Sequence, residues 1–249
     1  MFQGYYDLVS NMITQNRNMN IISNNISNVS TPGYKKDRLM QSTFREELIY
    51  RYDRDGKTPV GTVSRINTAD ERVTDYEKGG LRESASALNV ALTGNGFFAI
   101  QTENNGVVYT RDGSFNLDDQ RYLVLQGVGR VLGAGGQPIQ LPTDRVGIDQ
   151  QGNITSEDGF QRYGSLQIVD FADYAQLTKI TGDVFRTAAA PQAAADPQVR
   201  QRMVESSNVS MAEEMTQMIS GQRSLQSAAQ ILKIYDQLEG KLVVLGSVT

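Results

Sequence analysis

Five acidic residues in the middle of the chain could carry out acid–base chemistry: Asp112, Asp118, Asp119, Glu157 and Asp158. Two carboxylates are sufficient for glycoside hydrolysis. Each of the five, however, lies near Gly, Asn or Ser in a turn context, and the sequence has no tryptophan to form a sugar platform. We therefore interpret them as solvated turn carboxylates and predict no catalytic residues.

Other chemistry is limited by composition. The chain has no cysteine and no histidine, which excludes disulfides, thiolate nucleophiles, imidazole catalysis and the usual zinc ligands. Gly127–Gly129 lacks the spacing of a dinucleotide loop, and Asp53–Gly56 has its glycine at the wrong position for a calcium loop. Met211, Met215 and Met218 fall at helical spacing and are interpreted as packing groups rather than soft-metal ligands. We predict neither a metal site nor a cofactor.

Charge and hydropathy restrict the partners. The net charge of −4 provides no basic stripe for a phosphate backbone, so we expect no nucleic-acid partner. The first residues lack a basic region followed by an apolar run, and no segment is apolar enough to span a bilayer. We expect no membrane insertion, and export from the cytoplasm would need a route without a cleaved signal peptide.

Residues 1–33 have the pattern of an assembly helix. Its apolar positions repeat at alternating spacings of three and four, interrupted only at Gln15: Tyr5, Leu8, Met12, Met19, Ile22, Ile26 and Val29. Asp7 and Arg17 are the only charges, and the many asparagines make the helix marginal in isolation. The pattern ends at Ser30–Gly33, where proline and glycine favour a turn.

A second helix is predicted within residues 205–249. Ser210–Glu213 reads as a capping box, and Gly246 supplies a C-terminal stop. The predicted seam, which contains a shift resembling a stammer, is Met211, Met215, Met218, Gln222, Leu225, Ala228, Ile231, Tyr235, Leu238, Leu242 and Leu245. We expect the two terminal helices to pair as a coiled-coil-like core, with a helical hairpin inside a globular core as the alternative.

The centre of the chain has the pattern of strands and turns. Short apolar runs such as Phe97–Ile100, Val107–Tyr109, Tyr122–Leu125 and Leu166–Val169 alternate with Gly, Asn and Asp clusters. Tight hairpin turns are expected at 104–106, 111–113 and 151–153. The fold class is therefore α+β, with long terminal helices and a central, mostly antiparallel β domain. The expected segments are an N-terminal assembly helix (1–33), an extended linker that could hold a short helix near 42–52 (34–80), the β domain (81–185), a second linker (186–204) and a C-terminal assembly helix (205–249).

Four motifs resemble the flagellar rod and hook proteins, in the order of that family. They are Ser23-Asn-Asn-Ile-Ser-Asn-Val-Ser-Thr-Pro-Gly-Tyr-Lys35, Gly94-Asn-Gly-Phe-Phe98, Tyr109-Thr-Arg-Asp-Gly-Ser-Phe115 and Glu205-Ser-Ser-Asn-Val209. Asn89 departs from the acidic residue expected before its strand, and Arg121-Tyr122 stands where a turn glycine is usual. The length suits a rod protein better than a hook protein, and within the rod we favour the proximal part.

The resemblance implies a structural, non-enzymatic subunit of the flagellar basal-body rod. Such subunits form a helical polymer through their terminal helices, leave the cell by type III export without signal cleavage, and lie in the periplasmic axial rod. The implied partners are copies of the chain, other rod or hook proteins and the export apparatus. The alternative is a stalked β-domain binding module or adhesin, which would need heptads but not the Asn-rich corner.

The residues expected to mediate assembly lie at both ends. Amides of Asn24, Asn25 and Asn28 would suit uncharged hydrogen bonds between subunits, although they could simply be surface amides. The N-terminal set is Leu8, Met12, Met19, Ile22, Asn24, Asn25, Ile26, Asn28, Thr31, Gly33 and Tyr34. The C-terminal set is Glu205, Ser207, Asn208, Val209, Met215, Met218, Leu225, Ile231, Leu238 and Leu242.

Overall fold

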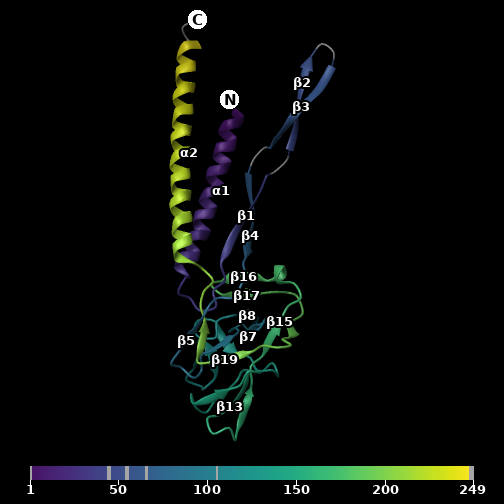
Figure 1. Cartoon of the computed structure of the whole chain (residues 1–249), viewed down its shortest axis with the longest axis vertical. Coiled ribbons are helices and arrows are strands. Elements are labelled where there is room, and N and C mark those ends of the chain that lie inside the picture. Colours follow the sequence, from purple (N-terminus) through teal and green to yellow (C-terminus); the bar gives the residue numbers. More distant parts are fainter. Residues whose placement is uncertain (1, 44–45, 54–55, 65–66, 105, 247–249) are drawn as a thin grey trace. The chain divides into compact units, whose positions relative to one another are not determined.

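The computed structural model describes residues 2–43, 46–53, 56–64, 67–104 and 106–246, and the chain divides into two compact units (Figure 1). Unit 1 comprises Met1–Ile26, Asp37–Val73 and Ser210–Thr249. Unit 2 comprises Ser27–Lys36 and Thr74–Val209. The chain therefore passes between the units several times.

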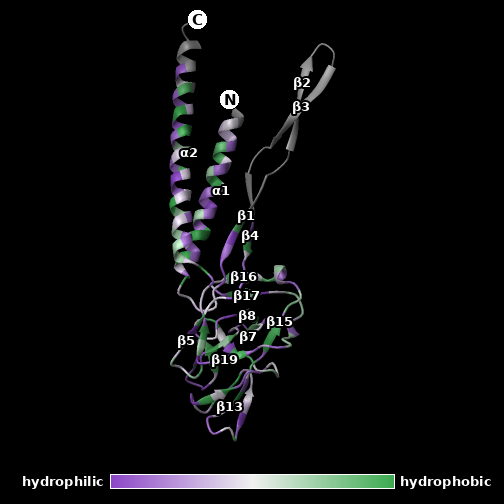
Figure 2. Ribbon diagram, viewed as in Figure 1, coloured by the Kyte–Doolittle hydropathy of each residue, from purple (hydrophilic) through white to green (hydrophobic). Residues whose placement is uncertain are grey.

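Unit 1 contains two long helices, α1 (Phe2–Ser27) and α2 (Met211–Gly246). They run antiparallel (Figure 1), so that Met19 lies over Gly221 and the Tyr235 hydroxyl lies beside Gly4. Helix α2 begins directly after Ser210, as the sequence predicted. Apolar and polar residues alternate along both helices, as Figure 2 shows, which is the pattern of partly exposed helices.

The predicted coiled-coil-like core is wrong. The buried positions of α2 include Glu214, Gly221 and Ala228, seven residues apart, two of which are too small to act as knobs. The larger seam residues Met215 and Leu238 are 50% and 52% exposed. No long seam of interlocking apolar side chains joins α1 and α2 over their described residues, because the small-residue face of α2 is turned toward α1.

Unit 1 also contains two strand pairs. Strand β1 (Asp37–Thr43) pairs with β4 (Asn67–Thr74), and β2 (Glu46–Asp53) pairs antiparallel with β3 (Gly56–Ser64). The short helix considered near 42–52 is therefore replaced by strands. Isoleucine and tyrosine in β2 favour extended structure once a partner strand is present. The division of the chain into five functional segments stays a prediction.

Unit 2 is a β domain whose strand pairs are antiparallel where their register is described, as the sequence predicted. One nine-stranded sheet has the order β16-β17-β8-β7-β11-β10-β9, with β15 paired to β7 and β18; β12-β13-β14, β6-β19 and β5-β20 form smaller sheets. Its strands are β5 (Leu81–Glu83), β6 (Val90–Leu92), β7 (Phe97–Gln101), β8 (Val107–Thr110), β9 (Phe115–Leu117), β10 (Leu123–Leu125), β11 (Gly129–Val131), β12 (Val146–Ile148), β13 (Asn153–Ser156), β14 (Arg162–Ser165), β15 (Ile168–Asp170), β16 (Thr178–Thr181), β17 (Val184–Arg186), β18 (Gln192–Ala193), β19 (Val199–Gln201) and β20 (Met203–Glu205), with a 3₁₀ turn at Tyr174–Gln176.

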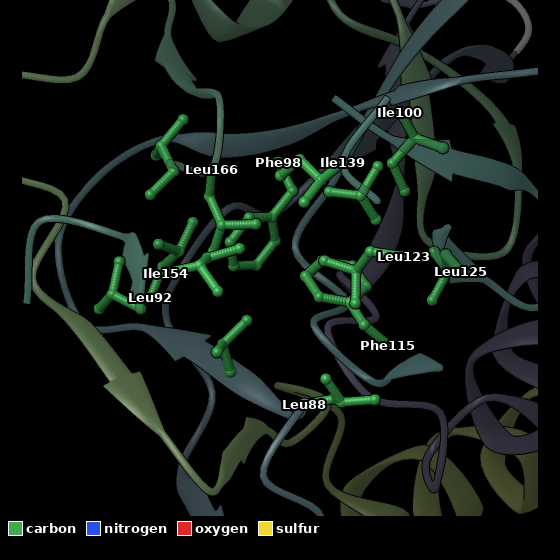
Figure 3. Close-up of a cluster of buried hydrophobic side chains, with 14 of the residues drawn as sticks. Leu88, Leu92, Phe98, Ile100, Phe115, Leu123, Leu125, Ile139, Ile154 and Leu166 are labelled. Atoms are coloured by element: carbon green, nitrogen blue, oxygen red, sulfur yellow. The ribbon is translucent and has the colours of Figure 1, made fainter. Parts of the chain in front are cut away.

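Strand β7 divides two apolar clusters. Phe98 and Ile100 belong to the larger one, in which Phe98 meets Phe115 edge to face (Figure 3). Phe97 and Ala99 belong to a second cluster of aromatic side chains. Because both faces of β7 are buried, its sequence is a continuous apolar run rather than an alternating one.

The predicted turns had different outcomes. Residues 151 and 152 lie in the turn of the β12–β13 hairpin, Asn153 begins β13, and Gly152 has a φ of 83°. Residues 111–113, however, connect β8 and β9, which are not paired with each other in the described sheets. Gly113 is required there by close packing, because a Cβ atom would lie 1.8 Å from Val90 O.

Neither α1 nor α2, over the residues that the structure describes, is apolar enough along its length to cross a bilayer.

Candidate functional site

Two segments of unit 2 lie against each other where the chain passes toward the parts of unit 1: residues 31–36 and residues 203–209. Gly33 N donates a hydrogen bond to Glu205 O (2.8 Å), and Lys36 N donates to Asn208 Oδ1 (2.7 Å). We call these two segments, with residues 75–79 and 109–114 that contact them, the junction. Three of the four motifs singled out in the sequence contribute residues to it, and the fourth contributes Gly94 O, which accepts from Arg111.

The turn at Pro32-Gly33 sets the path of the first segment. Gly33 has a φ of 67°, and a Cβ atom on it would lie 2.4 Å from Asp112 N and 2.5 Å from the carbonyl carbon of Arg111. Both the left-handed backbone and the close approach require glycine. The first and third motifs are therefore packed backbone to backbone.

A buried ion cluster holds the two segments together. Lys35 Nζ lies 2.7 Å from Glu205 Oε1, and Arg111 lies 3.6 Å from Glu205 Oε2; the three side chains are 1%, 4% and 1% exposed for Lys35, Arg111 and Glu205. Lys35 also donates to Glu77 O, and Gly79 N donates to Glu205 Oε1. Burial lowers the pKa of Lys35 although Glu205 acts in the opposite direction, and burial likewise lowers the pKa of Arg111.

Tyr34 is fully buried beside this cluster. Lys179 Nζ lies 3.8 Å from the centre of the Tyr34 ring and donates to Lys35 O at 2.6 Å. A cation over an aromatic face is attracted by the ring quadrupole. Strand β16 thus supplies a third support for the segment 31–36.

Two buried carboxyl groups complete the junction and its surroundings. Asp112 Oδ1 accepts from both the N–H and the hydroxyl of Ser114, and burial raises the pKa of Asp112 to about 6. Asp183 accepts from the Thr110 hydroxyl, and burial raises its pKa too. Both groups therefore bind a proton more readily than a solvated carboxylate does.

The predicted assembly residues divide between the junction and the helices. Tyr34, Gly33, Glu205 and Val209 are buried in unit 2. Thr31, Ser207 and Asn208 are half-buried there; Thr31 donates to Asn28 Oδ1, and Ser207 Oγ accepts from Val209 N. The structure thus gives these seven residues contacts within one subunit.

The helical members of the prediction have mixed exposure. Ile22 and Asn25 are buried, and Leu8, Met12, Met19, Ile26, Met218 and Leu225 are half-buried. Asn24, Met215, Ile231 and Leu238 are exposed, Asn28 follows α1 and is half-buried, and the side chain of Leu242 is outside the described ones. Asn25 uses its amide inside unit 1, where it donates to Glu214 Oε2 (3.1 Å). The assembly role of the set stays a prediction.

An open apolar groove of about 430 Å³ lies between α1 and α2 in unit 1. Its lining residues are Val9, Met12, Ile13, Asn16, Arg17, Leu225 and Leu232. Ile13 is itself 53% exposed, and Ile219 and Ile234 on α2 are 53% and 55% exposed. The helical part of the chain thus presents apolar side chains to solvent.

Sequence reasoning missed the charged residues in the junction, which are Lys35 as an ion-pair partner, Arg111 and Asp112, and the charged residues that contact it, Lys179 and Asp183. Apart from Asp112, which accepts from nearby Ser114, their partners lie far away in the sequence, and the Lys35–Glu205 hydrogen bond spans 170 positions. Arg111 and Asp112 were inside a recognised motif, but they were interpreted as turn residues. The sequence did contain one signal of their burial, because these two charged residues lie in a motif that also contains Gly, Phe and Tyr.

The acidic residues first considered for acid–base chemistry lie at a buried position, in a turn, or at the surface. Asp112 is buried, and Asp118 accepts from the backbone of its own turn and pairs with Arg130 at 3.2 Å. Asp119, Glu157 and Asp158 are exposed. Gly127–Gly129 forms the β10–β11 turn. Within the described part of the chain, no three carboxylates gather in a geometry that could hold a metal ion.

Comparisons with known proteins match most of the chain. Three family models match: "Flagella basal body rod protein" at residues 6–35, "Flagellar hook protein FlgE/F/G D1 domain" at 91–156, and "Flagellar basal body rod FlgEFG protein C-terminal" at 200–244. The chain is 31% identical to the flagellar basal-body rod protein FlgG of Bacillus subtilis (strain 168) over 98% of both chains. It is 32% identical to FlgF of Caulobacter vibrioides over 93% of both, and 30% identical to FlgG of Borreliella burgdorferi over 96% of this chain and 97% of that protein.

Proposed function

The chain belongs to the flagellar basal-body rod proteins, the structural components of the rod, and we propose that it joins the rod through its two terminal helices. It localises to the flagellar basal body and assembles with other rod or hook proteins. The family role is structural. That the chain has no enzymatic activity stays a prediction.

The observation that supports this proposal is the exposed apolar surface of unit 1. Met215, Ile219, Ile234 and Leu238 on α2 are each about half exposed, between 50% and 55%. Burying the exposed half of such a side chain is worth about 1 kcal/mol. Contacts with the helices of neighbouring subunits would cover this surface together with the open groove between α1 and α2.

The contacts in such a polymer are heterologous, because an open-ended helical assembly joins different surfaces of successive copies. The exposed residues of α2 fit this requirement. Met211, Met215 and Ile219 are spaced by four residues near its start, and Ile231, Ile234 and Leu238 lie on another part of its circumference near its end. One α2 could thus contact two neighbours.

We also propose a location for the subunit in the rod and a route for its export. The subunit would lie in the periplasmic part of the axial rod, and the flagellar type III apparatus would export it without removing a signal peptide. We favour the proximal part of the rod. Relatives named for two different rod proteins, FlgG and FlgF, match with similar identity.

A matched pair of α2 variants tests assembly through the helices. Leu225→Asp places a charge in the apolar groove, whereas Gln226→Asp places the same charge at an exposed neighbouring position. We expect Leu225→Asp to be absent from isolated basal bodies while its β domain remains folded by circular dichroism, and Gln226→Asp to be incorporated normally. Normal incorporation of Leu225→Asp would contradict the proposal.

Limited proteolysis of the purified monomer provides a second test. If the helices gain their order from neighbouring subunits, cleavage should remove α1 and α2 and leave a core that retains both parts of unit 2, Ser27–Lys36 and Thr74–Val209. Resistance of both termini in the monomer would favour a helical hairpin that is already stable, as expected of a stalked binding module.

A further inference from the structure

The segment 33–36 is buried in unit 2 although it belongs to no helix or strand. Its backbone is held by residues that lie much later in the chain. Gly33 N donates to Glu205 O, Asp75 N donates to Lys36 O, and Lys179 Nζ donates to Lys35 O. The segment is therefore enclosed by other elements of unit 2, and it is held by single hydrogen bonds rather than by a strand ladder.

Beside the buried Tyr34 ring, the segment is held by three buried charged side chains, Lys35, Glu205 and Arg111. Removing two ions from water costs several kcal/mol for each ion, which only good geometry and further hydrogen bonds can offset. The compensation is incomplete here: within the described residues, Arg111 Nε and Glu205 Oε2 are buried and make no hydrogen bond. The lowered pKa of Lys35 has the same cause, since burial outweighs the attraction of Glu205.

The remainder of unit 2 is built differently. Strands β7, β8 and β11 are joined by ladders of backbone hydrogen bonds, and Phe98, Ile100 and Val131 are completely buried in the larger apolar cluster. Regions of few ladder bonds and costly polar burial open more readily than strands inside an apolar core.

We propose that the Lys35–Glu205–Arg111 cluster is a latch that holds residues 31–36 in unit 2. When the latch opens, residues 31–36 leave unit 2 in a step that is separate from the unfolding of its β-sheet core. In the open state the three charged groups are hydrated and the core strands stay paired. The subunit thus has two folded states, which differ in whether the chain that follows α1 is held in unit 2. The latch is independent of the proposed assembly through the helices.

Amide hydrogen exchange, followed by NMR on the full chain, tests the latch. Gly33 and Lys36 report on the segment, because their amides bond to Glu205 O and Asn208 Oδ1. Ala99 and Leu132 report on the core, where they bond to Gln167 O and Ala99 O. We expect the amides of Gly33 and Lys36 to exchange at least about tenfold faster than those of Ala99 and Leu132, and with a weaker dependence on denaturant.

Two substitutions separate the opening steps. Ile100→Val weakens the core, so it should accelerate exchange of Ala99 and Leu132 about fivefold and leave Gly33 and Lys36 unchanged. Glu205→Gln weakens the closed latch, so it should accelerate Gly33 and Lys36 at least about tenfold; the core amides should follow by the same factor, because the closed state is their common reference.

Glu157→Gln makes the same chemical change at an exposed position and should alter none of the four rates. If all four amides exchange at one rate, or if Ile100→Val accelerates all of them equally, unit 2 opens as one body and the latch does not exist. The Ile100→Val comparison remains decisive even if Glu205→Gln fails to fold. Loss of assembly in the Leu225→Asp variant would leave these exchange rates unaffected.

Discussion

Asn25 and Asp37 exchange two hydrogen bonds, with Asn25 Nδ2 donating to Asp37 O at 2.9 Å and Asp37 N donating to Asn25 Oδ1 at 3.1 Å. The side-chain amide thereby acts as a backbone strand would, and it joins the last turns of α1 to the start of β1. Asn25 is 1% exposed. No other side chain of this size presents a donor and an acceptor in the same arrangement.

Asn25→Ala should therefore destabilise unit 1 by about 2 kcal/mol, because it leaves the N–H and C=O of Asp37 without these partners. Thermal unfolding followed by the helical circular dichroism signal would measure the change. Asn20→Ala, on an exposed position of α1, is the control and should be neutral or slightly stabilising. Equal effects of the two substitutions would show that the Asn25–Asp37 contact contributes nothing.

The ion cluster predicts different losses of stability when its cation Lys35 and its anion Glu205 are replaced. Lys35→Met leaves Glu205 with Arg111 and the amide of Gly79, whereas Glu205→Met leaves two buried cations without their anion. We expect Glu205→Met to cost about 4 kcal/mol and Lys35→Met to cost less. Urea unfolding followed by tyrosine fluorescence measures both losses. As a control, Lys78→Met at an exposed position should change the free energy of unfolding by less than about 0.5 kcal/mol. A larger loss for Lys35→Met would contradict the central role assigned to Glu205.

The pKa of Asp112 gives a pH dependence. Burial raises this pKa from 3.8 to about 6, so the folded chain binds the proton more tightly than the unfolded chain. The contribution of Asp112 to the free energy of unfolding therefore falls as the pH rises from about 4 to about 6, by about 3 kcal/mol, and is constant at higher pH. The variant Asp112→Asn cannot ionise and keeps an acceptor for Ser114.

The stability of Asp112→Asn relative to the parent should thus increase by up to about 3 kcal/mol between pH 4 and pH 7. Urea unfolding at a series of pH values measures it. Asp158→Asn, at an exposed carboxyl, serves as the control and should show no comparable trend. A difference between Asp112→Asn and the parent that does not vary with pH would mean that Asp112 titrates as a solvated residue.

Two turns of unit 2 have the same hydrogen bonds but different residues at the left-handed position. Asp118 Oδ1 accepts from the amides two and four residues later, and so does Asp149 Oδ1. The left-handed position is Arg121 (φ 65°) in the first turn and Gly152 (φ 83°) in the second. A side chain in this conformation costs roughly 1–2 kcal/mol relative to glycine.

Arg121→Gly should consequently stabilise unit 2, by about 0.5 kcal/mol once the lost bond to Pro142 O and the greater freedom of the unfolded chain are included. Gly152→Ala should destabilise it by at least about 1 kcal/mol, because its Cβ would also lie 3.2 Å from Ile168 Cδ1. Urea unfolding of both variants is the measurement. Changes of the same sign would argue against a common turn.

The elements that the sequence predicted well are those whose pattern is local. Strand β7 is a short apolar run between glycine-containing turns, and α2 begins after a residue suited to helix capping. The helix considered near 42–52 failed because β2 takes its structure from pairing with β3, which a local pattern does not record. The coiled-coil-like core failed because spacing shows where apolar residues recur, not which face of α2 approaches α1.

The candidate site was predicted only in part. Gly33, Tyr34, Glu205 and Asn208 were named from motifs, but as contacts between subunits. Their contacts within unit 2 surround the Lys35–Glu205 ion pair, and no periodic signal links two single charges so far apart in the chain. Motif recognition therefore located the residues without revealing their partners.

The separation of Lys35 and Glu205 also bears on the order in which the fold is completed. Closing a loop of 170 residues costs about 4–5 kcal/mol of chain entropy, so this contact forms late and only after other pairings have shortened the loop. A chain that is delivered from its N-terminus keeps Lys35 hydrated until residue 205 of 249 has emerged. The junction thus closes only after unit 2, which extends to Val209, has been delivered almost completely.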